Sequence, residues 1–302
     1  MCVHSVVCIS FIFIRFYFAV KIFQSMFAGL AQQRLRRVES TRFTLRYPDV
    51  SRSGWIAPWS LQEFFITACA ASESMRLLHA GGLVYPQIHH TVSMLIPSDD
   101  DMLEASRITD FQVDCGLEII GTEGSTLHMH ASFDLFDVTR PEWRRVLGEL
   151  VAVAVCVKKD NFERTNVPVD RICLSTAADT AAIATAANRR LTWPPPQSDP
   201  RIEEVTSFTI QPWHEDALQH VTNHMHSRFL WSALQKALPQ VTPGATVNFS
   251  IQFRKQVHAG QMVRVVLATC LENLSAVLMR GDAPVCIAEV SVQPYSKTRS
   301  AL

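Results

Sequence analysis

One segment of the chain concentrates side chains that could do chemistry: PWHEDALQHVTNHMHSRFLWSAL, residues 212–234. Within it, Asp216 and His220 are four residues apart on an expected loop, and Asn223 follows where a helix is expected to begin. A carboxylate there can activate water or attack a carbonyl carbon, and an imidazole can polarise the carbonyl or hold the carboxylate. The segment predicts a hydrolytic site; a metal site and a polar helix entrance without chemistry are the alternatives.

The start of that helix adds a second chemical property. Thr222 and Asn223 are both suitable N-cap residues, so the helix is expected to begin at one of them. The first backbone N–H groups of a helix have no partner within it and lie at the positive end of the helix dipole. Such an entrance can hold the charge that develops on a carbonyl oxygen under attack.

A metal site is the weaker alternative. Zinc would need His220, His224, His226 and Asp216 to converge on one point. His224 and His226 are two residues apart, which places them about 200° apart around a helix, so they do not share a face. The spacing also matches no established motif such as H-E-x-x-H. We therefore expect neither a metal nor a cofactor.

The elements that must position this segment follow an order that occurs twice. Each half opens with a short alternating strand, at 41–47 and at 205–211, followed by a polar turn. One long helix comes next, at 57–80 and at 222–238, and several β-rich runs follow it. A strand, a helix and a series of antiparallel strands describe an α+β unit in which a curved sheet wraps around one helix.

A proline-rich segment separates the two units. RRLTWPPPQSDPRIEE contains three consecutive prolines, which fit neither a helix interior nor a central strand. We therefore expect a first domain at 41–187, a semi-rigid linker at 188–203 and a second domain at 204–302.

Composition excludes several classes of function. The 28 basic and 28 acidic residues cancel, so no overall charge favours nucleic acid as a partner. The hydrophobic content of 48% suits a large packed core. The eight cysteines are scattered without a C-x-x-C pair, which excludes a zinc ribbon and favours a reducing compartment.

Residues 1–40 differ from the rest of the chain. The apolar run 6–20 is interrupted by Arg15 and is shorter than the roughly 20 residues that span a bilayer. No acidic residue precedes Glu39, although five basic residues do. We expect an apolar and basic leader that directs the protein to an organelle (mitochondrion or plastid) or anchors it in a membrane. Translation from Met26 would instead leave a short basic leader.

The segment DALQHVTNHMHSRFLW resembles the signature of hotdog-fold thioesterases, in which an Asp is followed by H-V-N-N and an aromatic residue. It is most similar to the plant and bacterial acyl-ACP thioesterases, whose second hotdog carries W-S-D-L-D-x-N-Q-H-V-N-N-x-x-Y. Allowing one residue fewer after the Trp, the matching residues are Trp213, Asp216, Gln219, His220, Val221 and Asn223.

The first half resembles the same family. RFTLRYPD (42–49), followed by LQE (61–63), is similar to the family's opening strand and first helix. GELVAVAVCVKKDNFERTNVP (148–168) is similar to a G-E-x-x-x-x-A stretch that ends in basic residues and a Pro. The resemblance therefore touches most of residues 42–293.

The chain also departs from the family pattern. Leu218 takes the place of a catalytic Asn, and Gln256 takes the place of a catalytic Glu. A Leu cannot hold a water molecule, and a Gln cannot accept a proton as a carboxylate does. In the first half Ser51, three residues before Gly54, stands where simpler hotdog thioesterases carry an Asp, and Trp-Ile-Ala-Pro (55–58) replaces H-V-N-N, an asymmetry that agrees with the resemblance to acyl-ACP thioesterases. The first site is therefore expected to have lost its chemistry.

The resemblance implies two tandem hotdog domains that hydrolyse fatty acyl thioesters, with acyl-ACP preferred to acyl-CoA. Asp216 would activate water or attack directly, and His220 and Asn223 would orient the reacting groups. The carbonyl oxygen would lie near the N–H groups at 221–223, so Val221, Thr222 and Trp213 are the expected substrate contacts. The acyl chain would lie in an apolar cavity between helix and sheet.

Two rival functions follow from the departures. A double hotdog without activity, which binds acyl chains or serves as a scaffold, is favoured by Leu218 and Gln256. A hotdog dehydratase also pairs Asp with His, but its order of residues fits this chain less well. Hotdog units pair through edge strands, and a tandem chain can satisfy that pairing internally. We therefore expect either a monomer of paired hotdogs or a homodimer.

Overall fold

The computed structural model describes residues 38–50, 55–97, 103, 105–172, 174, 189–195, 200–216, 219–238, 244–269 and 274–293. Almost all of the predicted leader, part of the linker and Leu218 lie outside these residues. Within the described part of the chain, no helix combines the length and the apolar character needed to cross a membrane.

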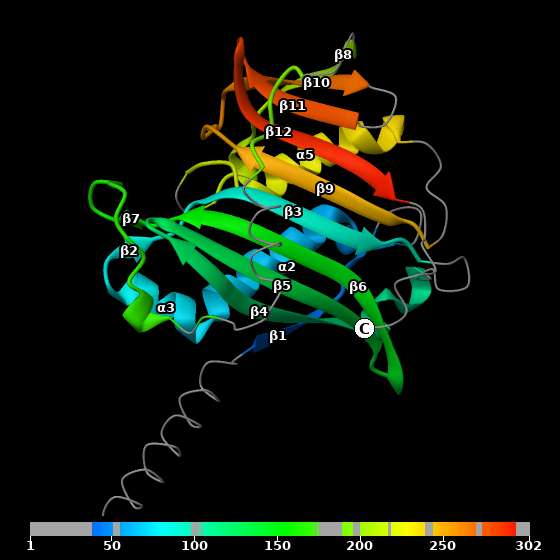
Figure 1. The fold of residues 1–302 in the computed structure, drawn as a ribbon. Coiled ribbons are helices and arrows are strands. Elements are labelled where there is room, and N and C mark those ends of the chain that lie inside the picture. The colour runs from blue at the N-terminus through cyan, green and yellow to red at the C-terminus, as the bar shows by residue number, and fades with distance from the viewer. Residues whose placement is uncertain are drawn as a thin grey trace, which may run out of the picture.

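Ten strands form one continuous antiparallel sheet that contains both halves of the chain (Figure 1). Across the sheet, the order is β1 (Glu39–Thr44), β4 (Phe111–Glu123), β5 (Thr126–Asp137), β6 (Arg140–Val155), β3 (Gln87–Leu95), β9 (Thr246–Phe253), β12 (Ala283–Gln293), β11 (Leu274–Arg280), β10 (Met262–Thr269) and β8 (Arg201–Thr209). The five strands of the second half mirror the order of those in the first, which is the arrangement that a duplicated unit produces. A separate pair joins β2 (Leu83–Val84) to β7 (Val157–Lys158).

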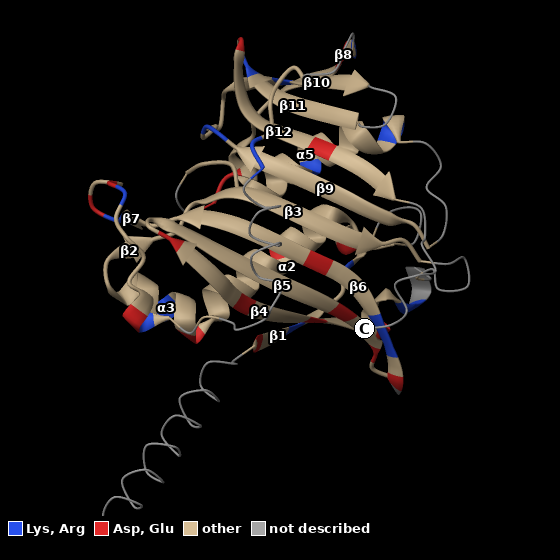
Figure 2. Cartoon of the chain, in the orientation of Figure 1, with Lys and Arg blue, Asp and Glu red and all other residues tan. Residues whose placement is uncertain are grey.

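The two halves meet where β3 pairs with β9. The register runs from His89 opposite Gln252 to Leu95 opposite Thr246. Because β3 and β9 occupy equivalent places in the two units, this pairing is the internal edge-to-edge contact that the sequence predicts for a tandem chain. Charged residues of both signs are interspersed over the sheet, and neither sign forms a continuous patch in this view (Figure 2).

Two long helices, α2 (Pro58–Ala71) and α5 (Asn223–Ala237), lie behind the same face of the sheet (Figure 1). The sheet strands alternate accordingly: Val113 and Cys115 on β4 are buried, while their neighbours are partly exposed. The two helices also contact one another. Trp55, three residues before α2, meets the Trp231 ring of α5 edge-on at 5.8 Å. Both units therefore contribute to one large apolar core, and a smaller separate cluster forms around Leu191, Val277, Met279 and Ile287.

The first helix differs from the prediction of one helix over 57–80. The structure ends α2 at Ala71 and begins a second helix, α3 (Glu73–Ala80). Ser72 between them is extended, and its Oγ accepts a hydrogen bond from the N–H of Met75. The Glu39 carboxylate accepts from the N–H groups of Glu73 and Ser74, so both side chains stabilise a new helix start.

Short 3₁₀ segments complete the described elements. They are η1 (Tyr47–Asp49), η3 (Ala105–Asp110), η4 (Val169–Arg171) and η5 (Pro212–His214). Of these, η1 and η5 each stand between the opening strand of a unit and its long helix, so they shape the two helix entrances.

Candidate active site

A tight loop brings Asp216 and His220 to face each other. The Asp216 N–H donates to the carbonyl of His220 at 3.1 Å, and Gln219 adopts a left-handed backbone (φ 59°) that reverses the chain. Glu215 and Val221, which flank this reversal, form an antiparallel bridge. The four-residue spacing predicted from the sequence therefore corresponds to a closed loop at the entrance of α5.

The side chains of this pair are in contact. Asp216 Oδ2 lies 3.5 Å from His220 Nδ1, and the two side chains are 33% and 23% exposed. This distance exceeds the roughly 2.7–2.9 Å of a strong charge-assisted bond, and such contacts commonly tighten when substrate binds. Because His220 presents Nδ1 to the carboxylate, its Nε2 is left to face a reacting group. The structure thus brings a carboxylate and an imidazole into contact, and both side chains are partly exposed.

The loop is held in place by the segment that follows β9. The Val221 N–H donates to the carbonyl of Val257 at 2.9 Å, and His258 Nδ1 lies 2.6 Å from the carbonyl of Gln219. The Glu215 carboxylate accepts from the Ala259 N–H. These contacts hold the loop in place. Glu215 takes part through its hydrogen bond with the Ala259 N–H, which is a structural role.

The first of these contacts corrects one expectation. Val221 was expected to offer its N–H to a carbonyl oxygen, but that N–H is already bound to Val257. By helix geometry, the groups without an intrahelical acceptor are instead those of Asn223 and His224, the first two residues of α5. A developing oxyanion would therefore bind one residue further along the chain than predicted.

Helix α5 begins at Asn223 with Thr222 as its N-cap, as the sequence predicted. The Thr222 carbonyl accepts from the N–H groups of Met225 and His226. Its side chain does not cap the helix; its Oγ1 lies 3.0 Å from His224 Nδ1. The hydroxyl of Thr222 is thus part of the polar surface at the entrance.

Two further sequence positions lie at the surface. Trp213, an expected substrate contact, is 76% exposed, and its ring touches only the edge of the His214 ring among the aromatic contacts of the described residues. Gln256, at the position of the family's Glu, is also exposed. Neither side chain is therefore buried against the Asp216–His220 pair.

His226 packs beneath the entrance. It is 3% exposed, its ring lies 6.0 Å from that of Phe253, and burial lowers its pKa to about 4. The imidazole is therefore neutral near pH 7. Among the described residues, no three His, Cys, Asp or Glu side chains converge as metal ligands would.

Sequence reasoning missed the residues that the first half contributes. Gln87, at the start of β3, places Oε1 3.5 Å from Asn223 Nδ2 and 2.6 Å from His90 Nε2. Glu63 on α2 accepts from Arg46 at 2.8 Å and acts electrostatically on His224, whose pKa is lowered by burial. No local motif signals these neighbours; only the pairing of the two halves brings them to α5.

The entrance of α2 has the same backbone design without the polar groups. Val50 and Ile56 form an antiparallel bridge there, as Glu215 and Val221 do in the second half. Trp55 precedes α2 by three residues, as His220 precedes α5, and it is buried. Pro58 opens the helix, so its first position carries no N–H donor. These described residues agree with a first entrance that has lost acid–base chemistry.

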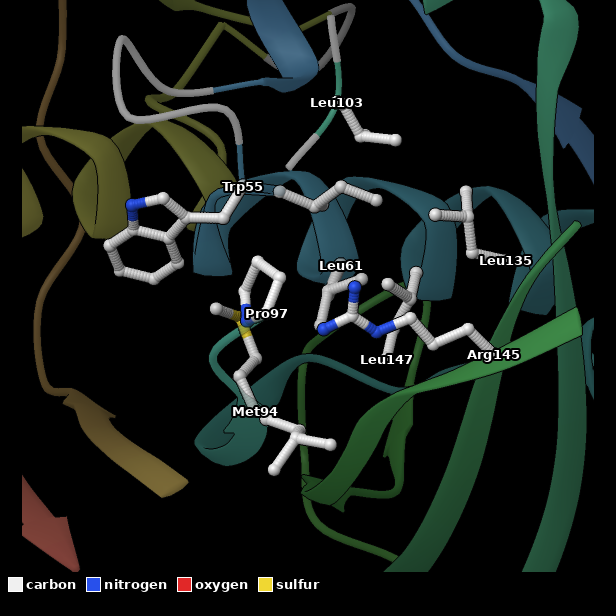
Figure 3. Close-up of a pocket in the computed structure, with 10 residues that line it drawn as sticks. Trp55, Leu61, Met94, Pro97, Leu103, Leu135, Arg145 and Leu147 are labelled. Atoms are coloured by element: carbon white, nitrogen blue, oxygen red, sulfur yellow. The ribbon is translucent and has the colours of Figure 1, made fainter. Parts of the chain in front are cut away.

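A small, partly open cavity lies beside this first entrance (Figure 3). Its lining is apolar except for Arg145, whose guanidinium group lies between Pro97 and Leu147 in Figure 3. The lining residues are Trp55, Ile56, Leu61, Met94, Leu95, Pro97, Leu103, Leu135, Arg145 and Leu147. Leu95 and Gln87 are the two ends of β3, about 26 Å apart at roughly 3.3 Å per residue. The cavity is therefore in the first half, but it does not adjoin Asp216.

Comparison with solved structures identifies the fold. An acyl-ACP thioesterase from Bacteroides thetaiotaomicron is 12% identical, with a TM-score of 0.57 over 85% of this chain and 98% of its own. A putative oleoyl thioesterase from Lactobacillus plantarum is 11% identical, with a TM-score of 0.58 over 86% and 98% of the two chains. The 12:0-ACP thioesterase from Umbellularia californica is 11% identical, with a TM-score of 0.57 over 85% and 97%.

No protein-family model and no curated protein sequence matches the chain. At the low identities of the solved structures, their similarity speaks for the architecture alone. It confirms the predicted α+β fold of two tandem hotdog units.

Proposed function

We propose that this protein is an acyl thioesterase that hydrolyses fatty acyl thioesters to free fatty acids, with acyl-ACP preferred to acyl-CoA. The observation that carries the proposal is the Asp216–His220 contact at the entrance of α5, next to helix N–H groups that can hold an oxyanion. The solved structures named above, two of them described as ACP thioesterases, support the choice of substrate class.

In the proposed reaction, the thioester carbonyl oxygen lies at the N–H groups of Asn223 and His224. Asp216 accepts a proton from water as the water oxygen bonds to the carbonyl carbon. The C–S bond then breaks, and the leaving sulfur takes up a proton that His220 can relay from Asp216. In the alternative route the Asp216 carboxylate attacks the carbon itself, the C–S bond breaks and the thiolate leaves, and water then cleaves the resulting mixed anhydride.

The small cavity beside α2 is proposed as a contact for part of an acyl chain, since its lining is apolar. Its position also favours the second candidate function, a protein that binds acyl chains without hydrolysing them. The cavity adjoins the entrance without acid–base groups, at Trp55 and Ile56, and lies at the far end of β3 from the entrance that has them.

One experiment separates the two functions. Purified protein is assayed with acyl-ACP and acyl-CoA thioesters of several chain lengths, beside Asp216→Ala. Hydrolysis by the wild type that the variant loses supports the thioesterase. Equal rates for both proteins remove Asp216 from the mechanism. Absence of hydrolysis, with fatty acid bound to the purified protein, would establish the binding function instead.

A further inference from the structure

Gln87 connects the first half of the chain to the candidate site in the second. Its Oε1 lies 2.6 Å from Nε2 of His90 and 3.5 Å from Nδ2 of Asn223. A carbonyl oxygen has two lone pairs, so it can accept both hydrogen bonds. The bond to His90 is short and the contact with Asn223 is long, so His90 fixes the glutamine amide and the amide then faces α5.

The surroundings of His90 determine which of its nitrogens carries the proton. The ring is buried between Phe65 and Phe253, whose centroids are 5.7 and 5.1 Å away in edge-on contacts. Burial lowers the pKa of His90 to about 3, so the imidazole is neutral near pH 7. A neutral ring has one N–H group, and the 2.6 Å contact with a carbonyl oxygen requires it at Nε2.

We propose that Gln87, held by His90, is a positioning residue that orients the side-chain amide of Asn223 for thioester hydrolysis. The inference rests on the function proposed above for the same site. With one Nδ2 proton directed to Gln87, the opposite side of the Asn223 amide presents Oδ1. Asn223 Oδ1 would therefore be oriented to accept a hydrogen bond from the attacking water.

A second polar side chain of the first half influences the first turn of α5 electrostatically. Glu63 on α2, paired with Arg46, acts electrostatically on His224, the residue after Asn223. The second-half entrance thus faces polar residues from both α2 and β3. Since Leu218 and Gln256 replace two of the family's polar groups within the second half, a group supplied by the first half would partly compensate for them.

The test uses the side-chain amide resonances of the full chain in a ¹H–¹⁵N spectrum. The Asn223 resonance pair is identified by its loss in Asn223→Asp. We expect it to shift in Gln87→Leu and in His90→Leu, and to stay in place in Gln112→Leu. Gln112 is a matched control because it is a half-buried strand glutamine of the first half, on β4. His90→Leu keeps the test decisive if Gln87→Leu does not fold.

Kinetics provide the second readout. Loss of one hydrogen bond should lower kcat by about 3- to 10-fold in Gln87→Leu, with KM little changed and Gln112→Leu unaffected. An Asn223 resonance that does not move in either Gln87→Leu or His90→Leu would overturn the inference. Absence of hydrolysis by the wild type would refute the proposed function but not the contact between Gln87 and Asn223. The Asn223 resonance reports on that contact without any enzymatic activity.

Discussion

Two buried histidines should make this fold sensitive to mild acid. His90 and His226 are almost fully buried, and burial lowers their pKa values to about 3 and about 4. In the unfolded chain a histidine binds its proton near pH 6.5. Between these values the unfolded state binds more protons than the folded state, so the free energy of unfolding falls as the pH drops below about 6.5.

The size of the effect can be worked out from these pKa values. Between about pH 7.5 and 5.5, each unfolded imidazole takes up nearly one proton while its folded counterpart takes up almost none. Each histidine therefore contributes a loss of about 1.3 kcal/mol, and the two together about 2.7 kcal/mol. This result is insensitive to the folded pKa as long as that value stays well below 5.5.

The assay is urea unfolding of the wild type and of the double variant His90→Leu/His226→Leu at both pH values. For each protein, the unfolding free energy at about pH 5.5 is subtracted from that at about pH 7.5, which removes the pH-independent cost of the substitutions. The difference between the wild-type and variant values then removes the contribution of the other titrating groups. We expect the drop in unfolding free energy to be about 2.7 kcal/mol smaller in the variant. An equal drop in both proteins would show that the imidazoles accept protons in the folded state, which their burial forbids.

Three further outcomes are expected. Leu135→Trp fills the cavity beside α2 and should weaken binding of a medium-chain fatty acid at least tenfold by calorimetry; unchanged affinity would place the acyl chain elsewhere. Trp231→Ala removes a side chain that contacts both Trp55 and Phe249 and should cost about 3–5 kcal/mol in urea unfolding, whereas a cost below about 1 kcal/mol would contradict a shared core. Ser72→Ala removes the cap of α3 and should cost about 1 kcal/mol in thermal unfolding; no loss would show that Glu39 alone sustains that helix start.

Much of the fold could be predicted from local sequence pattern. The alternation of apolar residues located the β-rich runs because strand side chains alternate between faces, and α5 begins where Thr222 and Asn223 offered a cap. The spacing of Asp216 and His220 also predicted a pair that the structure brings into contact. These features depend on residues close together in the chain.

The features that escaped prediction depend on contacts between distant segments. The break after α2 is stabilised by Glu39, more than thirty residues earlier, in addition to Ser72 itself. The N–H of Val221 donates to the carbonyl of Val257, in the segment that follows β9. Gln87 reaches Asn223 only because β3 pairs with β9. Periodicity and motif spacing carry no information about such pairs.

Joining the two units in one chain has a consequence for how the two entrances can diverge. In a dimer of identical subunits, every substitution at the helix entrance of one subunit also appears in the other, so the two entrances cannot change independently. Here β3 of the first unit pairs with β9 of the second, so the two units associate within a single polypeptide. The entrance of α2 can carry Trp55 and Pro58 while the entrance of α5 keeps His220 and Asn223. Covalent fusion thus lets the two helix entrances of one protein acquire different residues independently of each other.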